Sequence, residues 1–232
     1  MSEVNPLQLR LENVLKRLKK AETACGRPTG SVELLAVSKT RSAEEVRELY
    51  NLGQRSFGEN YLQDAEAKIE LLQDLPLSWH FIGRIQSNKT RPIAERFDWV
   101  HSLASLKHAR RLSEQRPSQL PPLNVCLQVN TSGESSKDGL SPEELTQQLG
   151  DYLQLPNLRV RGLMTIPAPA EGEDQRLPLQ LLRRLRDRLA TPEHPLETLS
   201  MGMSNDLEAA VAEGATMVRI GTAIFGPRAY NR

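Results

Sequence analysis

The regular alternation of short apolar segments with helical segments constrains the fold more than any other feature. Each apolar segment is short enough for a strand that is buried in a parallel sheet. Ser42 with Glu45 matches a capping box, and Ser141 followed by Pro142 is typical of a helix start. The predicted strands are 33–38, 55–58, 78–82, 98–101, 123–129, 158–164, 196–200 and 216–220. Helical segments follow the first seven, beginning at or near residues 42, 60, 87, 105, 142, 179 and 205.

Eight strand–helix repeats favour a closed (β/α)₈ TIM barrel, which is an α/β fold, over an open doubly wound sheet. No glycine-rich turn follows the first strand, where a dinucleotide-binding fold needs one. An extra amphipathic helix over residues 3–24 precedes the repeats. We expect a single domain over residues 1–232, with the N-terminal helix and a linker in 1–30 and the barrel in 31–228.

Composition excludes several classes of protein. The chain of 232 residues has a formal net charge of +1, so no global field attracts it to nucleic acid or a membrane surface. It has no apolar stretch near the roughly 20 residues of a membrane span, and no secretory signal. Cys25 and Cys126 are too distant to suggest a disulfide framework or a metal site. We expect a cytoplasmic, metal-free protein with free thiols, and a monomer because a closed barrel exposes no sheet edge.

Polar and glycine-rich segments gather at the carboxyl ends of the predicted strands, which form the functional face of an α/β barrel. Lys39 ends the first strand, where apolar packing disfavours the ammonium and prepares the amine to form a Schiff base with a carbonyl. The alternative is a lysine whose charged end reaches water. The other segments are 59–60, 83–89, 130–139, 164–165, 200–205 and 219–222.

The loops after the seventh and eighth strands predict a phosphate site. Ser204 precedes a helix expected to begin near Asn205, and Gly221 and Thr222 follow the eighth strand. Taken singly, these residues are also explained by a helix cap and a turn. A lysine for a carbonyl and a site for phosphate suggest pyridoxal 5′-phosphate (PLP), although a Schiff-base aldolase needs the same groups. Arg219 would meet the ring nitrogen and keep it unprotonated.

Seven motifs, found in order from about Leu34 to Arg228, resemble those of the pyridoxal phosphate homeostasis proteins (YggS/PROSC type). The resemblance implies an alanine-racemase-like barrel (PLP fold type III) that carries PLP on a lysine. The motifs are VSKT (37–40), FGENYLQDAEAK (57–68), HFIGRIQSNK (80–89), NTSGESSKDG (130–139), GLMTI (162–166), LSMGMSNDLEAA (199–210) and VRIGTAIFG (218–226).

The resemblance also assigns roles to residues at the matching positions. Lys137 matches a loop lysine with a part in cofactor exchange, and Arg41 stands where the family often has lysine. The implied cofactor-binding residues are Lys39 for the Schiff base, Ser204, Gly221, Thr222 and, more weakly, Ser200 for the phosphate, Arg219 for the ring nitrogen, and Asn60 and Met164 for the ring.

The family resemblance implies a protein that binds PLP and takes part in intracellular PLP and amino-acid homeostasis, with apo-enzymes as recipients and without strong catalysis. Alanine racemases add a second domain and a tyrosine as second acid/base, and we expect neither here. Tyr61 and Tyr152 fall in helical segments, Tyr230 is at the tail, and Lys39 is the one candidate base. We therefore expect no catalytic residues, the alternative being an amino-acid racemase or another weak PLP-dependent enzyme.

Two histidines lie within the predicted strands. We expect His80, between Trp79 and Phe81, to be a core histidine with its hydrogen bonds satisfied. His101 ends the fourth strand. Two positions are open to it there, one in the core and one that lines the mouth of the barrel. No histidine–acid cluster has the spacing of metal ligands.

Overall fold

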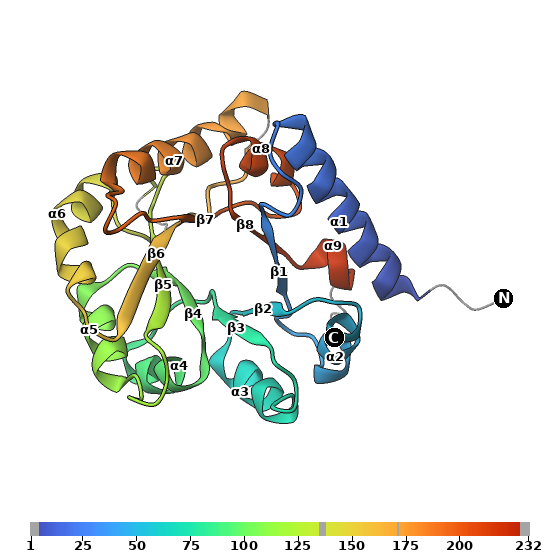
Figure 1. Ribbon diagram of the computed structural model, residues 1–232, viewed down its shortest axis with the longest axis horizontal. Helices are drawn as coiled ribbons and strands as arrows, with labels where there is room; N and C mark the ends of the chain where they lie inside the picture. Colours follow the sequence, from blue (N-terminus) through green and yellow to red (C-terminus); the bar gives the residue numbers. More distant parts are fainter. Residues whose placement is uncertain (1–4, 135–137, 171, 228–232) are drawn as a thin grey trace.

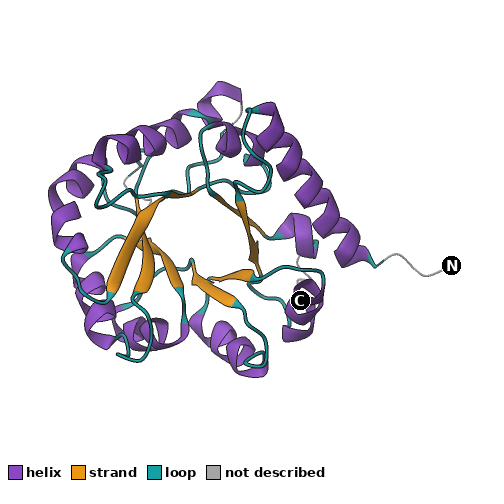
Figure 2. Cartoon of the chain, viewed as in Figure 1, coloured by secondary structure: helices purple, strands orange, loops and turns teal. Residues whose placement is uncertain are grey.

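The computed structural model describes residues 5–134, 138–170 and 172–227. In these residues, eight parallel strands pair in sequence order, and the first pairs with the last to close a barrel. Helices form a ring around the strands (Figures 1 and 2). The prediction of a barrel over an open sheet is confirmed, as is the N-terminal helix that precedes it.

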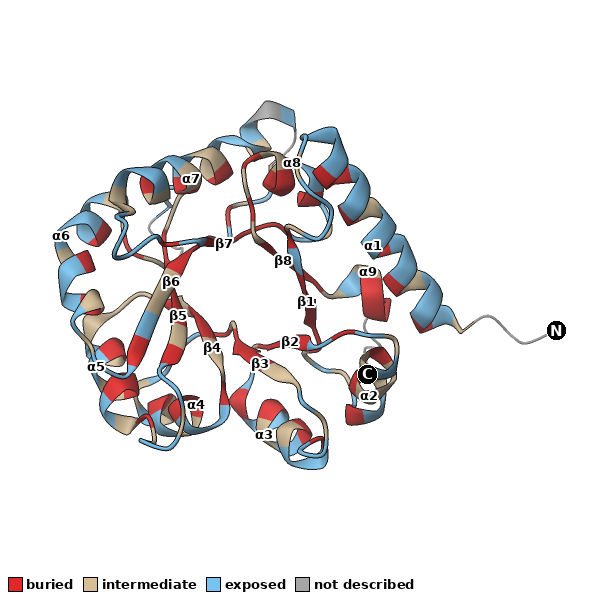
Figure 3. Ribbon diagram, viewed as in Figure 1, coloured by how far each residue is buried: buried red, intermediate tan, exposed pale blue. Residues whose placement is uncertain are grey.

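The strands are short, and most of their residues are buried (Figure 3), as expected for a parallel barrel, whose strands are covered on both faces. Their bounds are β1 (Glu33–Val37), β2 (Ser56–Glu59), β3 (Ser78–Phe81), β4 (Trp99–Leu103), β5 (Leu123–Gln128), β6 (Leu158–Met164), β7 (Thr198–Ser200) and β8 (Met217–Ile220). Each predicted strand therefore occurs within a few residues of its predicted position.

Each of the longer helices buries its apolar face against the barrel and exposes the opposite face to solvent (Figure 3). Their bounds are α1 (Pro6–Ala24), α2 (Ala43–Asn51), α3 (Leu62–Leu71), α4 (Thr90–Arg96), α5 (Leu106–Gln115), α6 (Pro142–Leu153), α7 (Leu177–Leu189), α8 (Leu207–Ala212) and α9 (Thr222–Phe225), with 3₁₀ turns at Ser87–Lys89 and Gly172–Gln175. The capping box is present at both Ser42–Glu45 and Ser141–Glu144, so these two helices begin where the sequence predicts.

The N-terminal helix α1 packs on the side of the barrel against α8 and α9 (Figure 1). The Arg17 guanidinium donates to both carboxylate oxygens of Glu208 and, at 2.7 Å, to the backbone carbonyl of Ser204. Arg10 donates to the carbonyl of Phe225 at 3.5 Å. This helix therefore contacts the segments that follow β7 and β8, which are the Ser204 loop with α8 and the helix α9.

The elements after β7 differ in detail from the prediction. Helix α8 begins at Leu207 rather than near Asn205, because Asp206 takes the N-cap position and its carboxylate accepts from the amide of Met203 at 2.5 Å. The sequence did not predict α9, a single turn that begins at Thr222 directly after β8. Ser204 thus lies in the loop that leads to a short helix rather than at the helix start.

Candidate cofactor site

A cavity of about 570 Å³ opens at the carboxyl ends of the strands. This volume is within the usual range of small-molecule sites, about 300–1,000 Å³. Its described lining combines three cationic side chains with small polar and apolar residues and holds no carboxylate. The lining residues are Val37, Lys39, Arg41, Asn60, Ile82, Ile166, Met203, Ser204, Asn205, Arg219, Gly221, Thr222 and Ala223. The positive field of such a cavity favours an anionic ligand.

Lys39 is presented to the cavity by a tight turn at the end of β1. The amide of Arg41 donates to the carbonyl of Ser38 at 3.0 Å, which closes a four-residue turn. Thr40, the third residue of this turn, has φ of 64°. A left-handed conformation is unusual for a β-branched residue and is what a type II turn demands at this position. The turn places a half-buried Lys39 at the mouth of the cavity.

A buried ion pair supports this turn from beneath. The Lys68 ammonium contacts the carboxylate of Glu59 and donates to the backbone carbonyl of Ser38 at 2.7 Å. The Ser38 hydroxyl donates to the same Glu59 oxygen at 2.6 Å. Burial raises the pKa of Glu59, and the contacts with Lys68 and Ser38 oppose that rise. Three elements, β1, β2 and α3, are thus joined directly behind Lys39.

Arg219 reaches the cavity from β8 and is held by neutral oxygens. Its Nη1 donates to the carbonyl and the hydroxyl of Ser200, at 2.6 and 2.8 Å, and its Nη2 donates to the carbonyl of Thr165 at 2.7 Å. Burial lowers the pKa of Arg219 to about 10, so the guanidinium stays charged at neutral pH. A guanidinium has five N–H donors, and those not used here suit a neutral acceptor such as a pyridine nitrogen.

The loops after β7 and β8 come together at the other side of the cavity. Ser204 and Thr222 bring hydroxyl groups, and Gly221 allows close approach to the backbone. Gly202 has φ of 99°, and a Cβ there would lie 2.6 Å from the Cβ of Ala210, so glycine is required for this loop path. Helix α9 begins at Thr222, and the amides of Ile224 and Phe225 both donate to the carbonyl of Gly221 at 2.9 Å.

Asn60 lies between β2 and β3 at the cavity wall. Its Oδ1 is buried and has no hydrogen-bond partner among the described residues. Buried polar atoms are nearly always partnered, so this oxygen points to a ligand that donates a hydrogen bond. Together with the remaining donors of Arg219 and the half-buried amine of Lys39, it fits a ring that carries a carbonyl, a hydroxyl and an aromatic nitrogen.

The structure brings six of the eight predicted cofactor residues into one cavity, namely Lys39, Asn60, Ser204, Arg219, Gly221 and Thr222. The other two, Met164 and Ser200, are fully buried at the ends of β6 and β7 and do not line it. Ser200 instead contacts Arg219 from below. Lys137, predicted to take part in exchange, lies outside the described residues.

Sequence reasoning gave no role to the apolar wall of the cavity. Ile82 directly follows β3 and Ile166 follows β6, and both line the cavity. Each lies within one of the seven family motifs. In a sequence, however, an isoleucine beside a strand that contacts a ligand looks the same as one that packs in the core. His101 does not line this cavity: it is fully buried, and both ring nitrogens are hydrogen-bonded.

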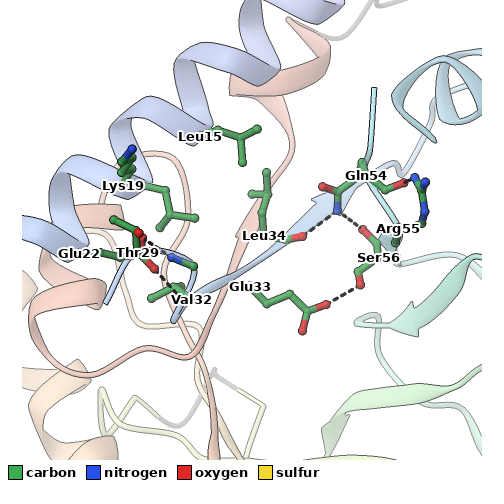
Figure 4. A pocket seen from close by; sticks show the side chains of 12 residues that line it. Leu15, Lys19, Glu22, Thr29, Val32, Glu33, Leu34, Gln54, Arg55 and Ser56 are labelled. Atoms are coloured by element: carbon green, nitrogen blue, oxygen red, sulfur yellow. Dashed lines mark hydrogen bonds between the residues drawn. The ribbon is translucent and has the colours of Figure 1, made fainter. Parts of the chain in front are cut away.

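A second cavity, of about 460 Å³, lies at the opposite, N-terminal ends of β1 and β2 beside α1 (Figure 4). Several of its polar groups are hydrogen-bonded to one another. Gln54 donates to the carbonyls of Leu34 and Ser56 at 2.7 Å, and the Ser56 hydroxyl donates to the carboxylate of Glu33 at 2.5 Å. We therefore place the candidate site in the cavity at the carboxyl ends.

Other chemistry has less support in the structure. The described residues contain no group of three or more histidine, cysteine or carboxylate side chains that could hold a metal ion. None of the helices in the described part of the chain combines the length and apolar character needed to cross a membrane. Cys25 and Cys126 are free thiols, as predicted, and burial raises the pKa of Cys126 to about 12.

Comparison with known proteins identifies a family for the whole chain. The family model for the N-terminal domain of alanine racemase matches residues 9–229. The pyridoxal phosphate homeostasis protein of Pseudomonas aeruginosa is 60% identical over 223 residues, which cover 94% of this chain and 96% of that protein. The Escherichia coli K12 protein of the same name is 48% identical over 235 residues, covering 99% of this chain and 100% of that protein.

Solved structures agree with this assignment. PipY of Synechococcus elongatus, solved without PLP, is 39% identical, with a TM-score of 0.85 over 95% of this chain and 100% of PipY. PipY with PLP bound gives a TM-score of 0.78 at 39% identity, over 90% of this chain and 100% of PipY. Alanine racemase of Clostridium difficile, 17% identical with a TM-score of 0.77, matches 97% of this chain through 58% of its own length and shows a shared fold. The chain therefore belongs to the pyridoxal phosphate homeostasis protein family and has the alanine racemase N-terminal fold.

Proposed function

We propose that this protein holds PLP covalently on Lys39 and takes part in intracellular PLP and amino-acid homeostasis without strong catalysis of its own. The observation that carries the proposal is the cationic cavity, in which Lys39, Arg219 and the hydroxyls of Ser204 and Thr222 meet. PLP supplies an aldehyde that a lysine amine captures as an imine, and a phosphate that a positive cavity retains. A PLP-bound PipY structure at 39% identity supports the same ligand class.

Each residue would make a distinct contribution. Lys39 would tether the aldehyde carbon, Ser204 and Thr222 would donate to the phosphate, and Arg219 would donate to the ring nitrogen. Because Arg219 stays protonated, it would leave that nitrogen without a proton and weaken the ring as an electron sink. Such a site retains the cofactor while giving little help to carbanion chemistry.

The alternative, an amino-acid racemase, needs acid/base groups on both faces of the bound substrate. Among the described lining residues, Lys39 is the one amine, and tyrosine, histidine and carboxylate groups are absent. Tyr152 is buried in α6, Tyr61 is exposed at the start of α3, and Tyr230 lies outside the described residues. These positions support a carrier over a racemase.

The direct test of function combines binding and turnover. The purified protein loaded with PLP should show a visible chromophore, and L- and D-alanine should interconvert no faster with it than with an equal concentration of free PLP. Recipients would be apo-enzymes that need PLP. Racemisation well above the rate with free PLP would contradict the proposed carrier role, and absence of a chromophore would contradict the cofactor assignment.

A further inference from the structure

We propose that His80, His101 and Ser200 form a buried relay that positions Arg219 toward the cavity, which makes His101 a positioning residue for the bound ring. The identification of the bound ring as that of PLP rests on the proposed function. The relay itself rests on the geometry of the barrel interior. The relay would explain why two histidines lie in the core of the barrel. It would also explain how Ser200 affects the cavity without lining it, because Ser200 holds Arg219.

The relay is a continuous line of hydrogen bonds across the barrel from β3 to β8. The hydroxyl of Ser78 lies 3.0 Å from Nε2 of His80, whose Nδ1 lies 2.9 Å from Nε2 of His101. Nδ1 of His101 lies 2.7 Å from Oγ of Ser200, and that oxygen accepts from Nη1 of Arg219 at 2.8 Å. His80, His101 and Ser200 are each at most 1% exposed, so water does not compete for these bonds.

Donor and acceptor counting gives the relay one direction. Arg219 only donates, so Oγ of Ser200 accepts from it, and the single hydrogen of Ser200 goes to Nδ1 of His101. His101 then carries its proton on Nε2 and donates to His80, which in turn donates from Nε2 to Ser78. In the opposite direction, the buried Ser200 hydroxyl would have no acceptor among the described residues, a costly arrangement.

The two histidines are neutral in this arrangement. Burial lowers the pKa of His80 to about 3. Burial also lowers the pKa of His101 well below its ordinary value, with further contributions from His80 and Arg219. The charge therefore stays on Arg219, and no described carboxylate forms an ion pair with it. The charge of Asp206 favours the guanidinium from beyond ion-pair distance, so among the described residues the direct contacts of this buried cation are oriented neutral acceptors.

Packing holds the relay rigid. The ring of His80 stacks on Trp99 with a centroid distance of 5.4 Å and an interplanar angle of 4°. Rotation of either histidine would break two hydrogen bonds in a close-packed interior. The acceptor oxygens of Ser200 and Thr165 therefore fix one edge of the Arg219 guanidinium, and its remaining N–H groups serve the cavity.

The test compares His101→Leu, which removes the acceptor for Ser200, with His101→Asn, whose amide oxygen can replace it. His194→Leu is the control because His194 is exposed between α7 and β7. The measurement is the rate at which bound PLP leaves after dilution into PLP-free buffer. We expect about tenfold faster loss for His101→Leu, equivalent to about 1.4 kcal/mol, near-normal loss for His101→Asn, and no change for His194→Leu. Equal loss from wild type and His101→Leu, or no rescue by asparagine, would overturn the relay.

A second measurement does not depend on the cofactor or on the folding of a variant. Nitrogen-15 NMR of the PLP-free wild-type protein at neutral pH should show His80 and His101 as neutral rings that are protonated on Nε2. A charged ring, or a proton on Nδ1 of His101, would overturn the relay. If the wild-type protein binds no PLP, the proposed function fails and this spectrum still decides whether the relay exists.

Discussion

The Lys68 ammonium contacts the Glu59 carboxylate directly beneath the turn that presents Lys39, and the two side chains are 6% and 0% exposed. Two lysines thus lie near the end of β1, and they differ in burial and in position relative to the cavity. Lys68 is buried beneath the turn and does not line the cavity, whereas Lys39 is half-buried and lines it. This difference accounts for why Lys39, and not Lys68, would be the lysine that captures an aldehyde.

Removing one member of this buried pair should be strongly destabilising. Lys68→Met leaves the Glu59 carboxylate without its counter-ion, and we expect a loss of about 3–5 kcal/mol in the free energy of unfolding. Glu59→Gln combined with Lys68→Met should recover much of that loss because no charge remains buried. Urea unfolding of the two single variants and the double variant measures the coupling. Simple additivity of the two single effects would show that the pair does not act as a unit.

The contact between α1 and the loop after β7 should affect ligand binding more than stability. Arg17 is 37% exposed, and its ion pair with Glu208 lies at the surface, so Arg17→Ala should cost less than about 1 kcal/mol in stability. The loss of its bond to the Ser204 carbonyl frees the predicted phosphate loop, so PLP affinity should fall several-fold. Arg47→Ala is the control because it removes a similarly exposed pair with Asp74, and neither residue lines the cavity. Equal PLP affinity in both variants would refute this link.

Acid should destabilise the protein through its buried histidines. The pKa of His80 is lowered from 6.5 to about 3 on folding, so the unfolded chain binds a proton in this range that the folded protein does not. Its contribution to stability is fully present above pH 6.5 and is lost as the pH falls toward 3, by up to about 1.4 kcal/mol per pH unit. His101 acts in the same direction. The slope of unfolding free energy against pH should be smaller for His80→Asn than for wild type, and an unchanged slope would exclude this origin.

Close backbone packing beside the site should make Gly83, like Gly202, difficult to replace. A Cβ on Gly83 would lie 1.9 Å from the backbone oxygen of Asn60, so Gly83→Ala should destabilise the barrel and displace Asn60. Gly150, in α6, has open space around its Cβ position, and Gly150→Ala should stabilise the protein by up to about 1 kcal/mol. Thermal unfolding of the two variants gives the comparison. Similar melting temperatures would contradict the predicted clash.

Much of the fold was predictable because its signals are local. Several strands, such as β1 and β5, are short runs rich in apolar residues, and the capping boxes at Ser42 and Ser141 mark helix starts independently of the rest of the chain. The start of α8 was misplaced because three polar residues in succession, Ser204, Asn205 and Asp206, can each cap a helix, and in the structure Asp206 takes the N-cap position. Sequence alone does not rank equivalent caps.

The site was predictable where a barrel rule applies, and less so where contacts join distant strands. The ends of β1, β7 and β8 were assigned from their order along the chain, which placed Lys39, Ser204 and Thr222 on one face. The relay from His80 to Arg219 depends on which strand interiors face one another across the barrel, and on bonds between residues up to 99 positions apart. No sequence periodicity encodes those contacts, so the role of Ser200 emerged from the structure.

The most direct test of the central claim is peptide mapping after borohydride reduction of the PLP-loaded protein. Reduction fixes an imine as a stable adduct, and mass spectrometry then identifies the modified lysine. We predict one adduct, on Lys39, that is lost in Lys39→Ala while some non-covalent PLP binding remains through the phosphate. An adduct on Lys68 or another lysine, or no adduct on a protein that has bound PLP, would contradict the assignment of Lys39 as the residue that holds the cofactor.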